Sequence, residues 1–121
     1  MVLILGGLGS GKTEYARSLG FSDADFSPDA FSDRPVLDHL EALVRSDPAS
    51  ATELLPALLK KKIVICREVG SGVIPMEKAD RAYREAVGRL CAALAKEATS
   101  VVRLVCGIPV ALKGELPCAS D

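Results

Sequence analysis

The stretch that decides the fold is Val2-Leu3-Ile4-Leu5-Gly6-Gly7-Leu8-Gly9-Ser10-Gly11-Lys12-Thr13. Residues 2–5 are apolar and predict a buried strand. Residues 6–13 match the pattern G-x-x-x-x-G-K-[ST] in full. A helical pattern follows over Thr13–Leu19, and Gly20 is placed to end that helix. The chain is therefore expected to open with a strand, a glycine-rich turn and a helix.

The residue types at positions 6–13 suit a polyphosphate ligand. Glycines let consecutive backbone N–H groups turn inward around phosphate oxygens, and the start of the helix adds its own unpaired N–H groups. Lys12 would reach the β- and γ-phosphates, and the Thr13 hydroxyl would hold Mg²⁺. A glycine-rich turn that binds nothing is the alternative. The candidate residues for binding a nucleotide or phosphate are Gly6, Gly7, Leu8, Gly9, Ser10, Gly11, Lys12 and Thr13.

The composition predicts one globular domain over residues 1–121. Hydrophobic residues make up 49% and charged residues 26%, which excludes a disordered chain. The net charge of −1 gives no indication of a nucleic-acid partner. No apolar run approaches a membrane span and Met1 leads directly into the first strand, so a cytoplasmic location is expected. The cysteines lack C-x-x-C spacing, which favours buried free thiols over disulfides or a metal site: Cys66, Cys91, Cys106 and Cys118.

The segment 21–35 is acidic and contains all three phenylalanines. We interpret it as a surface loop that the phenylalanines pin to the core; a lid beside the phosphate site is the alternative. Pro35 is expected to open a helix, and Ala49–Leu59 predicts another helix with a break near Pro56. The helix from Pro35 would bury one apolar stripe, made of Leu37, Leu40, Leu43 and Val44.

The run Ile63–Cys66 predicts a second buried parallel strand, and Lys60-Lys61-Lys62 before it is interpreted as a solvated entrance to that strand. Glu68 follows the strand at its carboxyl end, where open parallel sheets bind ligands. We therefore expect Glu68 to hold Mg²⁺, directly or through water, or to orient a substrate hydroxyl. A carboxylate that caps local N–H groups is the alternative.

The rest of the chain completes an α/β pattern. Pro75 to Ala98 predicts the longest helix, Val101–Cys106 a third strand, and 107–112 an antiparallel edge strand, with residues 114–121 frayed. This alternation predicts a three-layer sandwich like that of P-loop NTPases, with a small, mostly parallel sheet and helices on both faces. The inward side of the long helix would consist of Ala79, Ala82, Tyr83, Ala86, Val87, Leu90, Ala93 and Leu94.

Three further segments carry a resemblance to a known family. They are Glu68-Val69-Gly70-Ser71-Gly72-Val73-Ile74-Pro75, then Gly88-Arg89-Leu90, then Val105-Cys106-Gly107-Ile108-Pro109-Val110-Ala111-Leu112-Lys113. Their order and spacing resemble the Glu-Val-Gly-x-Gly-x-Val-Pro, Gly-Arg and terminal Gly-x-x-(x)-x-x-Lys elements of the bifunctional adenosylcobinamide kinase and adenosylcobinamide-phosphate guanylyltransferase family. With the glycine-rich start, the resemblance covers roughly residues 1–18 and 60–113.

The resemblance implies an enzyme of cobalamin assembly. Members phosphorylate the aminopropanol hydroxyl of adenosylcobinamide with ATP or GTP, then transfer GMP through a guanylylated histidine. It implies that residues 6–13 hold the nucleotide phosphates, and that Lys12 and Glu68 belong to the catalytic rim with Mg²⁺. This chain is shorter, and before Ile63 we identify neither a strand carrying the family's acidic residue nor its histidine-bearing segment. His39, the only histidine, resembles part of a later amphipathic helix, so the guanylylated role is not assigned to it.

Two positions depart from the family pattern. Arg67 stands where Asn is common before the Glu, and Cys91 stands where Asn usually follows Gly-Arg-x. We favour the kinase step over guanylyl transfer, because the latter needs a nucleophile. A non-catalytic nucleotide-binding protein and a small P-loop kinase for another substrate remain alternatives. A homo-oligomer is expected, since family members form oligomers and a small sheet gains by burying an edge.

Overall fold

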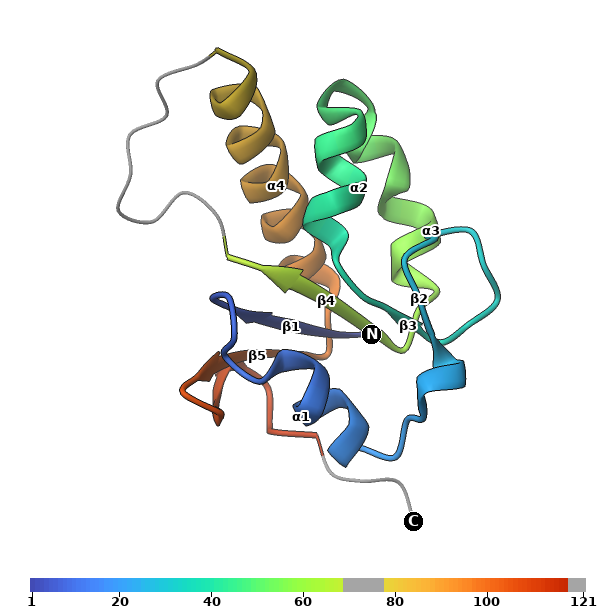
Figure 1. Cartoon of the computed structure of the whole chain (residues 1–121), viewed down its shortest axis with the longest axis vertical. Helices are drawn as coiled ribbons and strands as arrows, with labels where there is room; N and C mark the ends of the chain where they lie inside the picture. The colour runs from blue at the N-terminus through green and yellow to red at the C-terminus, as the bar shows by residue number, and fades with distance from the viewer. Residues whose placement is uncertain (69–77, 118–121) are drawn as a thin grey trace.

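The computed structural model describes residues 1–68 and 78–117. Its centre is a six-stranded sheet in the order β2-β3-β4-β1-β5-β6 (Figure 1). β6 runs antiparallel to β5, and every other neighbouring pair is parallel. The strands are β1 (Val2–Gly6), β2 (Phe26–Ser27), β3 (Val36–Leu37), β4 (Ile63–Arg67), β5 (Ser100–Val105) and β6 (Ile108–Lys113).

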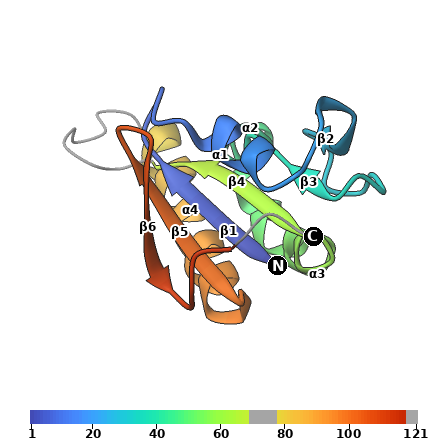
Figure 2. The ribbon, with the colours of Figure 1, turned by 90° about the horizontal axis from the view of Figure 1, so that it is seen from below.

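Helices cover both faces of the sheet, as predicted. Figure 1 shows the first helix, α1, apart from the group formed by α2, α3 and α4, and Figure 2 shows α4 behind the sheet. The α-helices are α1 (Lys12–Ser18), α2 (Leu40–Ser46), α3 (Leu55–Leu59) and α4 (Lys78–Glu97). Two 3₁₀-helices, η1 (Asp23–Asp25) and η2 (Pro48–Leu54), lie in the connections.

Alternation along the strands divides the buried side chains into two cores. Leu3 of β1 and Val64 of β4 belong to the core under α2, α3 and α4. Ile4 and Ile65, their neighbours in sequence, belong to the core under α1, which Ala16 enters from the helix. Successive residues of a strand point to opposite faces. One parallel strand therefore supplies both layers, which is why the central strands read as continuous apolar runs.

The helix predicted from Pro35 is wrong at its start. Val36 and Leu37 form β3, fully buried and paired with Ile63 and Val64 of β4, and α2 begins only at Leu40. The carbonyl of Pro35 accepts backbone hydrogen bonds from Lys62 and Ile63 at 2.9 and 3.2 Å. Pairing with a distant strand outweighs the helical spacing of the leucines. The expectation that this part of the chain lacks a further strand was also wrong.

The acidic segment 21–35 is anchored by two of its three phenylalanines. Phe26 lies in β2 and is buried, and Phe21 packs against the core under α1. Phe31 is 75% exposed and anchors nothing. The interpretation as a connection pinned to the core is therefore confirmed in part, although the segment also contains η1 and β2.

The lysine triplet before β4 is not uniformly solvated. Lys60 and Lys62 are exposed, as predicted, but Lys61 is only 6% exposed. Its ammonium donates to the carbonyls of Ser32 and Arg34 at 2.6 and 2.8 Å. The buried Lys61 ammonium supplies hydrogen-bond donors to loop carbonyls that would otherwise lack them.

Other elements differ from the predictions in detail. Residues 48–59 form η2 followed by α3, so the break falls just before Pro56. In α4, Ala82 is exposed rather than inward, whereas Tyr83, Val87, Leu90 and Leu94 are buried. Residues 75–77, the side chain of Ala79, Cys118 and the end of the tail lie outside the described residues.

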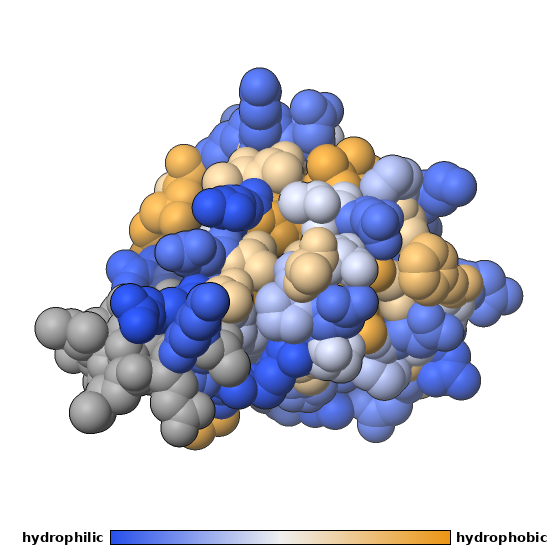
Figure 3. Space-filling view, turned by 90° about the horizontal axis from the view of Figure 1, so that it is seen from above, coloured by the Kyte–Doolittle hydropathy of each residue, from blue (hydrophilic) through white to orange (hydrophobic). Residues whose placement is uncertain are grey.

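Among the described cysteines, all three thiols are free, as predicted. Cys66 is buried and Cys91 is half-buried, but Cys106 is exposed, because it lies in the turn after β5 rather than inside a strand. No helix in residues 1–68 and 78–117 has the length and apolar content that crossing a membrane requires. In the view from above, apolar side chains form separate patches among polar ones (Figure 3).

Candidate functional site

The glycine-rich turn after β1 uses backbone conformations that other residues rarely adopt. Gly9 and Gly11 have φ of 71° and 93°, in the left-handed region. Gly6 is required for space, because a Cβ there would come within 2.3 Å of the Ser10 Oγ and 3.0 Å of the Leu104 carbonyl. The Ser10 N–H donates to the Gly7 carbonyl at 3.2 Å and closes the turn. The local sequence therefore dictates the loop's shape.

The turn between β5 and β6 supports the glycine-rich loop from outside. Cys106 and Gly107 have φ of 50° and 78°, the combination that tight hairpins with two left-handed residues need. The Gly107 N–H donates to the Ser10 carbonyl at 3.0 Å. The segment with family-like sequence near the end of the chain thus packs directly against the loop near its beginning.

A cavity of about 450 Å³ lies over this loop on the α1 side of the sheet. Its volume falls in the range of small-ligand sites. Of the predicted residues, Gly6 and Gly7 lie outside the lining, although both build the loop beneath it. The cavity is lined by Leu8, Gly9, Ser10, Gly11, Lys12, Thr13, Glu14, His39, Glu41, Ile65 and Arg67.

Lys12 points back into the glycine-rich loop. Its Nζ donates to the Gly7 carbonyl at 2.6 Å, so a phosphate oxygen would take the place of that carbonyl. Burial lowers the pKa of Lys12, while the nearby carboxylate of Glu41 acts in the opposite direction. The ammonium is thus partly desolvated at the site where a polyphosphate would need a cation.

The sequence analysis missed Glu41 as a site residue. Glu41 is 8% exposed, and its Oε1 accepts a hydrogen bond from the Arg67 backbone N–H at 2.7 Å. Its Oε2 lies 3.3 Å from Nδ1 of His39. The sequence signal was weak: Glu41 stands two residues after His39. The helix predicted from Pro35 placed both residues away from the glycine-rich loop. The structure brings both side chains to the wall of the cavity.

His39 and Asp38 occupy the carboxyl end of β3. His39 has φ of 56°, a left-handed conformation unusual for a residue with a side chain, and it precedes α2. Its Nε2 lies 4.0 Å from Oδ2 of Asp38. The Oδ1 atom of Asp38 is buried without a hydrogen-bond partner. A strand followed directly by an acidic residue is therefore present in the region where the sequence analysis identified none.

Glu68 lies on the other face of the sheet. Its N–H donates to the Gly6 carbonyl at 2.8 Å, which places it beside the loop. Its carboxylate accepts two hydrogen bonds from Arg103 of β5, at 2.8 Å from Nε and 3.2 Å from Nη2. Glu68 lines a second cavity of about 360 Å³ and not the first. Arg67 lines both cavities, so they meet at the end of β4.

Two thiols lie beneath this second cavity. The Cys66 and Cys91 thiols interact with each other; this contact and burial raise the pKa of Cys66, while the hydrogen bond from Cys66 lowers the pKa of Cys91. Cys91 also lines the cavity wall. Within the described part of the chain, no three His, Cys, Asp or Glu side chains gather as a metal site.

Comparison with known proteins connects this geometry to a family. Residues 33–112 match the model of the cobinamide kinase / cobinamide phosphate guanyltransferase family. The chain belongs to this family. The matched part contains β3 with Asp38 and His39, the end of β4, and the β5–β6 hairpin, whereas the glycine-rich loop precedes it. No curated protein matches the chain.

The family match defines the chemistry only at the family level. Members are enzymes of cobalamin biosynthesis that use a nucleotide and cobinamide as substrates. The resemblance drawn from the sequence is confirmed. The roles of the individual residues at positions 6–13 and 68 stay predictions.

Proposed function

We propose that this protein is a nucleotide-dependent cobinamide kinase. The observation that carries the proposal is the cavity over residues 6–13, where a glycine-rich loop, a partly desolvated lysine and the family-matched segment with Glu41 meet. Phosphoryl transfer depends mainly on positioning and on stabilising charge, which such a loop can supply. ATP or GTP is the expected phosphoryl donor.

The proposed roles follow from where the side chains lie. The loop N–H groups and Lys12 would hold the nucleotide phosphates, and the Thr13 hydroxyl lines the same cavity. Mg²⁺ is the expected ion: Asp38, which follows β3 and precedes the cavity-lining His39 without lining the cavity itself, has a buried carboxylate oxygen without a partner. We propose Thr13 and Asp38 as its protein ligands; when bound, the ion would neutralise charge on the phosphates.

Glu68 would then act on the acceptor rather than on the metal. Its carboxylate is held by Arg103 on the opposite face of the sheet from the phosphate cavity. A fixed carboxylate at that place can accept a hydrogen bond from the acceptor hydroxyl and orient it. This favours the hydroxyl-orienting alternative for Glu68 over direct contact with Mg²⁺.

The test is mass spectrometry of adenosylcobinamide after incubation with the protein, Mg²⁺ and either ATP or GTP. A phosphorylated corrinoid is expected from the wild-type protein and not from the Lys12→Ala variant. An Arg17→Ala variant serves as control, because Arg17 lies on the same helix but pairs with Glu14 and Asp23. Unchanged corrinoid together with calorimetric nucleotide binding would favour the non-catalytic alternative. Turnover with a different hydroxyl substrate would favour another small kinase.

One observation favours guanylyl transfer as a second candidate function. His39 lines the phosphate cavity, and its ring lies between the carboxylates of Asp38 and Glu41. A nucleophilic histidine oriented by a carboxylate is a known arrangement for covalent catalysis. If it operates here, neutral-pH mass spectrometry after incubation with GTP would detect a GMP adduct on the protein that His39→Asn abolishes. An adduct that persists in that variant would exclude His39.

A further inference from the structure

A pair of thiols connects the centre of the sheet to the longest helix. Cys66 belongs to β4 and is fully buried, and Cys91 belongs to α4 and packs against the same core. Both are free cysteines, and their thiols are hydrogen-bonded to each other. The proposed phosphoryl transfer uses neither of them. A disulfide forms where the fold already brings two cysteine side chains together, and this pair meets that requirement.

The two thiols differ in their access to solvent. Cys91 lines the second cavity, of about 360 Å³, whereas Cys66 does not line it. Gly88 lies one helical turn before Cys91 in the same wall, and a Cβ added at Gly88 would meet no atom within 4 Å. The wall beside Cys91 is therefore open. A small oxidant that enters the cavity meets Cys91 and not Cys66.

The hydrogen bond between the thiols favours the same order of reaction. The bond from Cys66 lowers the pKa of Cys91, while burial and the Glu41 carboxylate act in the opposite direction. The same bond, together with burial, raises the pKa of Cys66. The thiolate is the nucleophilic form of a cysteine. Cys91 is thus prepared to attack an oxidant, and Cys66 is a neutral thiol held within reach of it.

We propose that Cys91 and Cys66 form a redox-active pair, in which hydrogen peroxide oxidises Cys91 and Cys66 then closes a disulfide between α4 and β4. In the first step, the Cys91 sulfur forms a bond to one peroxide oxygen while the O–O bond breaks, and the other oxygen leaves as water with the thiol proton. In the second step, the Cys66 sulfur bonds to the Cys91 sulfur and the S–O bond breaks. The departing hydroxide takes the Cys66 proton and leaves as water. The two thiols together lose two electrons, and the peroxide gains them.

The disulfide would form beside the point where the two cavities meet. Cys66 directly precedes Arg67, and its Sγ lies 3.4 Å from the Arg67 carbonyl oxygen. Arg67 lines both cavities, and its N–H donates to Glu41. Oxidation would therefore tie this end of β4 to α4. A cross-link between two elements of the fold restricts the unfolded chain, so the oxidised protein should be the more stable form.

The test uses the full chain with Cys106→Ser and Cys118→Ser, which leaves Cys66 and Cys91 as its two cysteines. The reduced protein is treated with hydrogen peroxide, quenched with N-ethylmaleimide, and analysed by intact mass and peptide mapping. We expect a monomer lighter by two hydrogen atoms, without maleimide adducts, and a linked pair of peptides that contains both cysteines. Dithiothreitol should restore both thiols. Two unreacted thiols, or sulfinic acid on Cys91 instead of the disulfide, would overturn the proposal.

Single replacements in this two-cysteine protein test the order of attack. With Cys66→Ala, Cys91 should accumulate sulfenic acid, which dimedone traps and mass spectrometry detects. With Cys91→Ala, Cys66 should remain a thiol under the same treatment, because it does not line the cavity. Dimedone on Cys66 in that variant would overturn the assigned order. Circular dichroism checks that each variant is folded.

A measurement without core replacements tests whether the fold holds the thiols together. The two-cysteine protein is equilibrated with glutathione redox buffers, in native buffer and in urea that unfolds it. The ratio of disulfide to dithiol should be on the order of 10-fold higher in the native protein, because a disulfide that fits the fold is favoured by folding. Equal ratios in the two conditions would overturn the proposal.

Gly88→Leu tests the route of the oxidant. Leucine at this position extends into open cavity space without a clash at its Cβ, so peroxide should consume the Cys91 thiol several-fold more slowly. Ala92→Leu is the matched control, because Ala92 is exposed on the same helix and does not line the cavity. Equal rates in the two variants would reject the cavity as the entrance. These measurements use neither nucleotide nor corrinoid, so the thiol pair and the proposed kinase are tested separately.

Discussion

Two lysines at opposite edges of the same sheet show the difference between the proposed binding site and a structural support. Lys12 follows β1 at the carboxyl edge, and Lys61 precedes β4 at the amino edge. Both lie beside cavities of similar size, about 450 and 420 Å³. Cavity size alone therefore does not separate the two edges.

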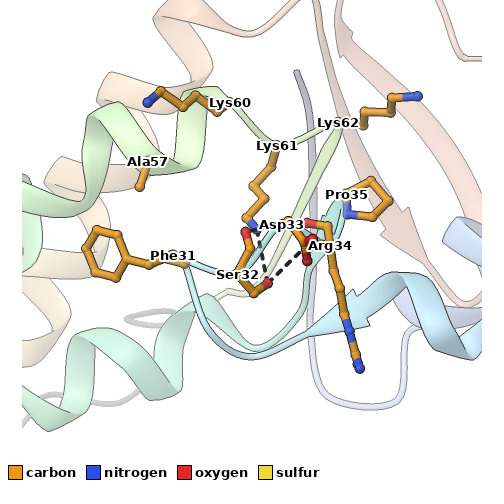
Figure 4. A pocket seen from close by; sticks show the side chains of 10 residues that line it. Phe31, Ser32, Asp33, Arg34, Pro35, Ala57, Lys60, Lys61 and Lys62 are labelled. Carbon is orange, nitrogen blue, oxygen red and sulfur yellow. Dashed lines mark hydrogen bonds between the residues drawn. The ribbon is translucent and has the colours of Figure 1, made fainter.

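The hydrogen bonds of the two ammonium groups do separate them. Lys61 donates to the Ser32 carbonyl, the Ser32 hydroxyl and the Arg34 carbonyl, which uses all three of its donors. Figure 4 shows its side chain directed into the loop, while Lys60 and Lys62 point elsewhere. Within residues 1–68 and 78–117, the Lys12 ammonium donates one hydrogen bond, to the Gly7 carbonyl. A lysine with its donors used by the chain holds the fold, and one with donors to spare can take a ligand.

Polar atoms without partners point to the same edge. In the described part of the chain, the buried side-chain atoms lacking a hydrogen bond are the Ser10 Oγ and the Asp38 Oδ1, and both follow the carboxyl ends of strands. Burying such atoms without partners costs free energy. In the proposed site, a bound nucleotide and Mg²⁺ would satisfy these groups at the carboxyl edge, whereas the described residues of the amino edge contain no buried side-chain atom that lacks a partner.

The largest expected effect is on nucleotide binding in Lys12→Ala. Loss of a charge-assisted contact to phosphate should weaken binding on the order of 100-fold. The urea midpoint should stay close to wild type, because Lys12 contributes one hydrogen bond to the loop. Isothermal titration calorimetry measures the affinity. If the variant bound nucleotide with wild-type affinity, Lys12 would not belong to the binding site. The contrast between the two edges would then fail.

Lys61→Met should show the opposite pattern. The carbonyls of Ser32 and Arg34 lose their donor, so the free energy of unfolding should fall by roughly 2 to 3 kcal/mol in urea titrations. Lys60→Met is the control: Lys60 is exposed at the same entrance and should change stability by less than about 0.5 kcal/mol. Nucleotide affinity should be unchanged in both. Equal stability of the two variants would show that the buried hydrogen bonds are not what holds the loop.

The sequence predicted the parts of the molecule that depend on neighbours in the chain. The glycine-rich loop is specified by residues 6–13 themselves, and β1, β4 and β5 are long apolar runs. The edge strand β6 follows from a short turn after β5. These elements carry their own signal because local conformation and burial point to the same structure.

The parts of the molecule that the sequence did not predict depend on contacts between residues far apart in the chain. β3 has two residues, and it exists because Val36 and Leu37 pair with β4, far along the chain. Leu37 of β3 also fits the apolar spacing of the following helix α2. The sequence analysis therefore predicted a single helix where the structure has a strand and a helix. That error placed His39 and Glu41 on an assumed helix. The contact of Glu41 with the Arg67 N–H, 26 residues away, is not visible in local sequence.

A smaller effect is expected from Gly107→Ala in the β5–β6 turn. Its φ of 78° costs a residue with a side chain about 1 kcal/mol of stability. Gly20→Ala is matched, because Gly20 has φ of 103° and neither added Cβ meets an atom within 4 Å. Only Gly107 donates to the Ser10 carbonyl in the glycine-rich loop, so only Gly107→Ala should also weaken nucleotide binding, by a few-fold. Equal nucleotide affinity in the two variants would show that the turn does not support the loop.

The smallest effect is expected at the amino edge, in Phe31→Ser. Phe31 is 75% exposed beside the cavity that contains Lys61, so its removal should change the free energy of unfolding by less than about 0.5 kcal/mol and leave the proposed kinase activity intact. Phe26→Ala, in the buried β2, should cost about 3 kcal/mol and shows that the assay detects an anchoring phenylalanine. A stable Phe31→Ser protein that loses activity would make the amino edge a ligand site. The distinction drawn from the two lysines would then fail, because a lysine with every donor used would stand beside a working site.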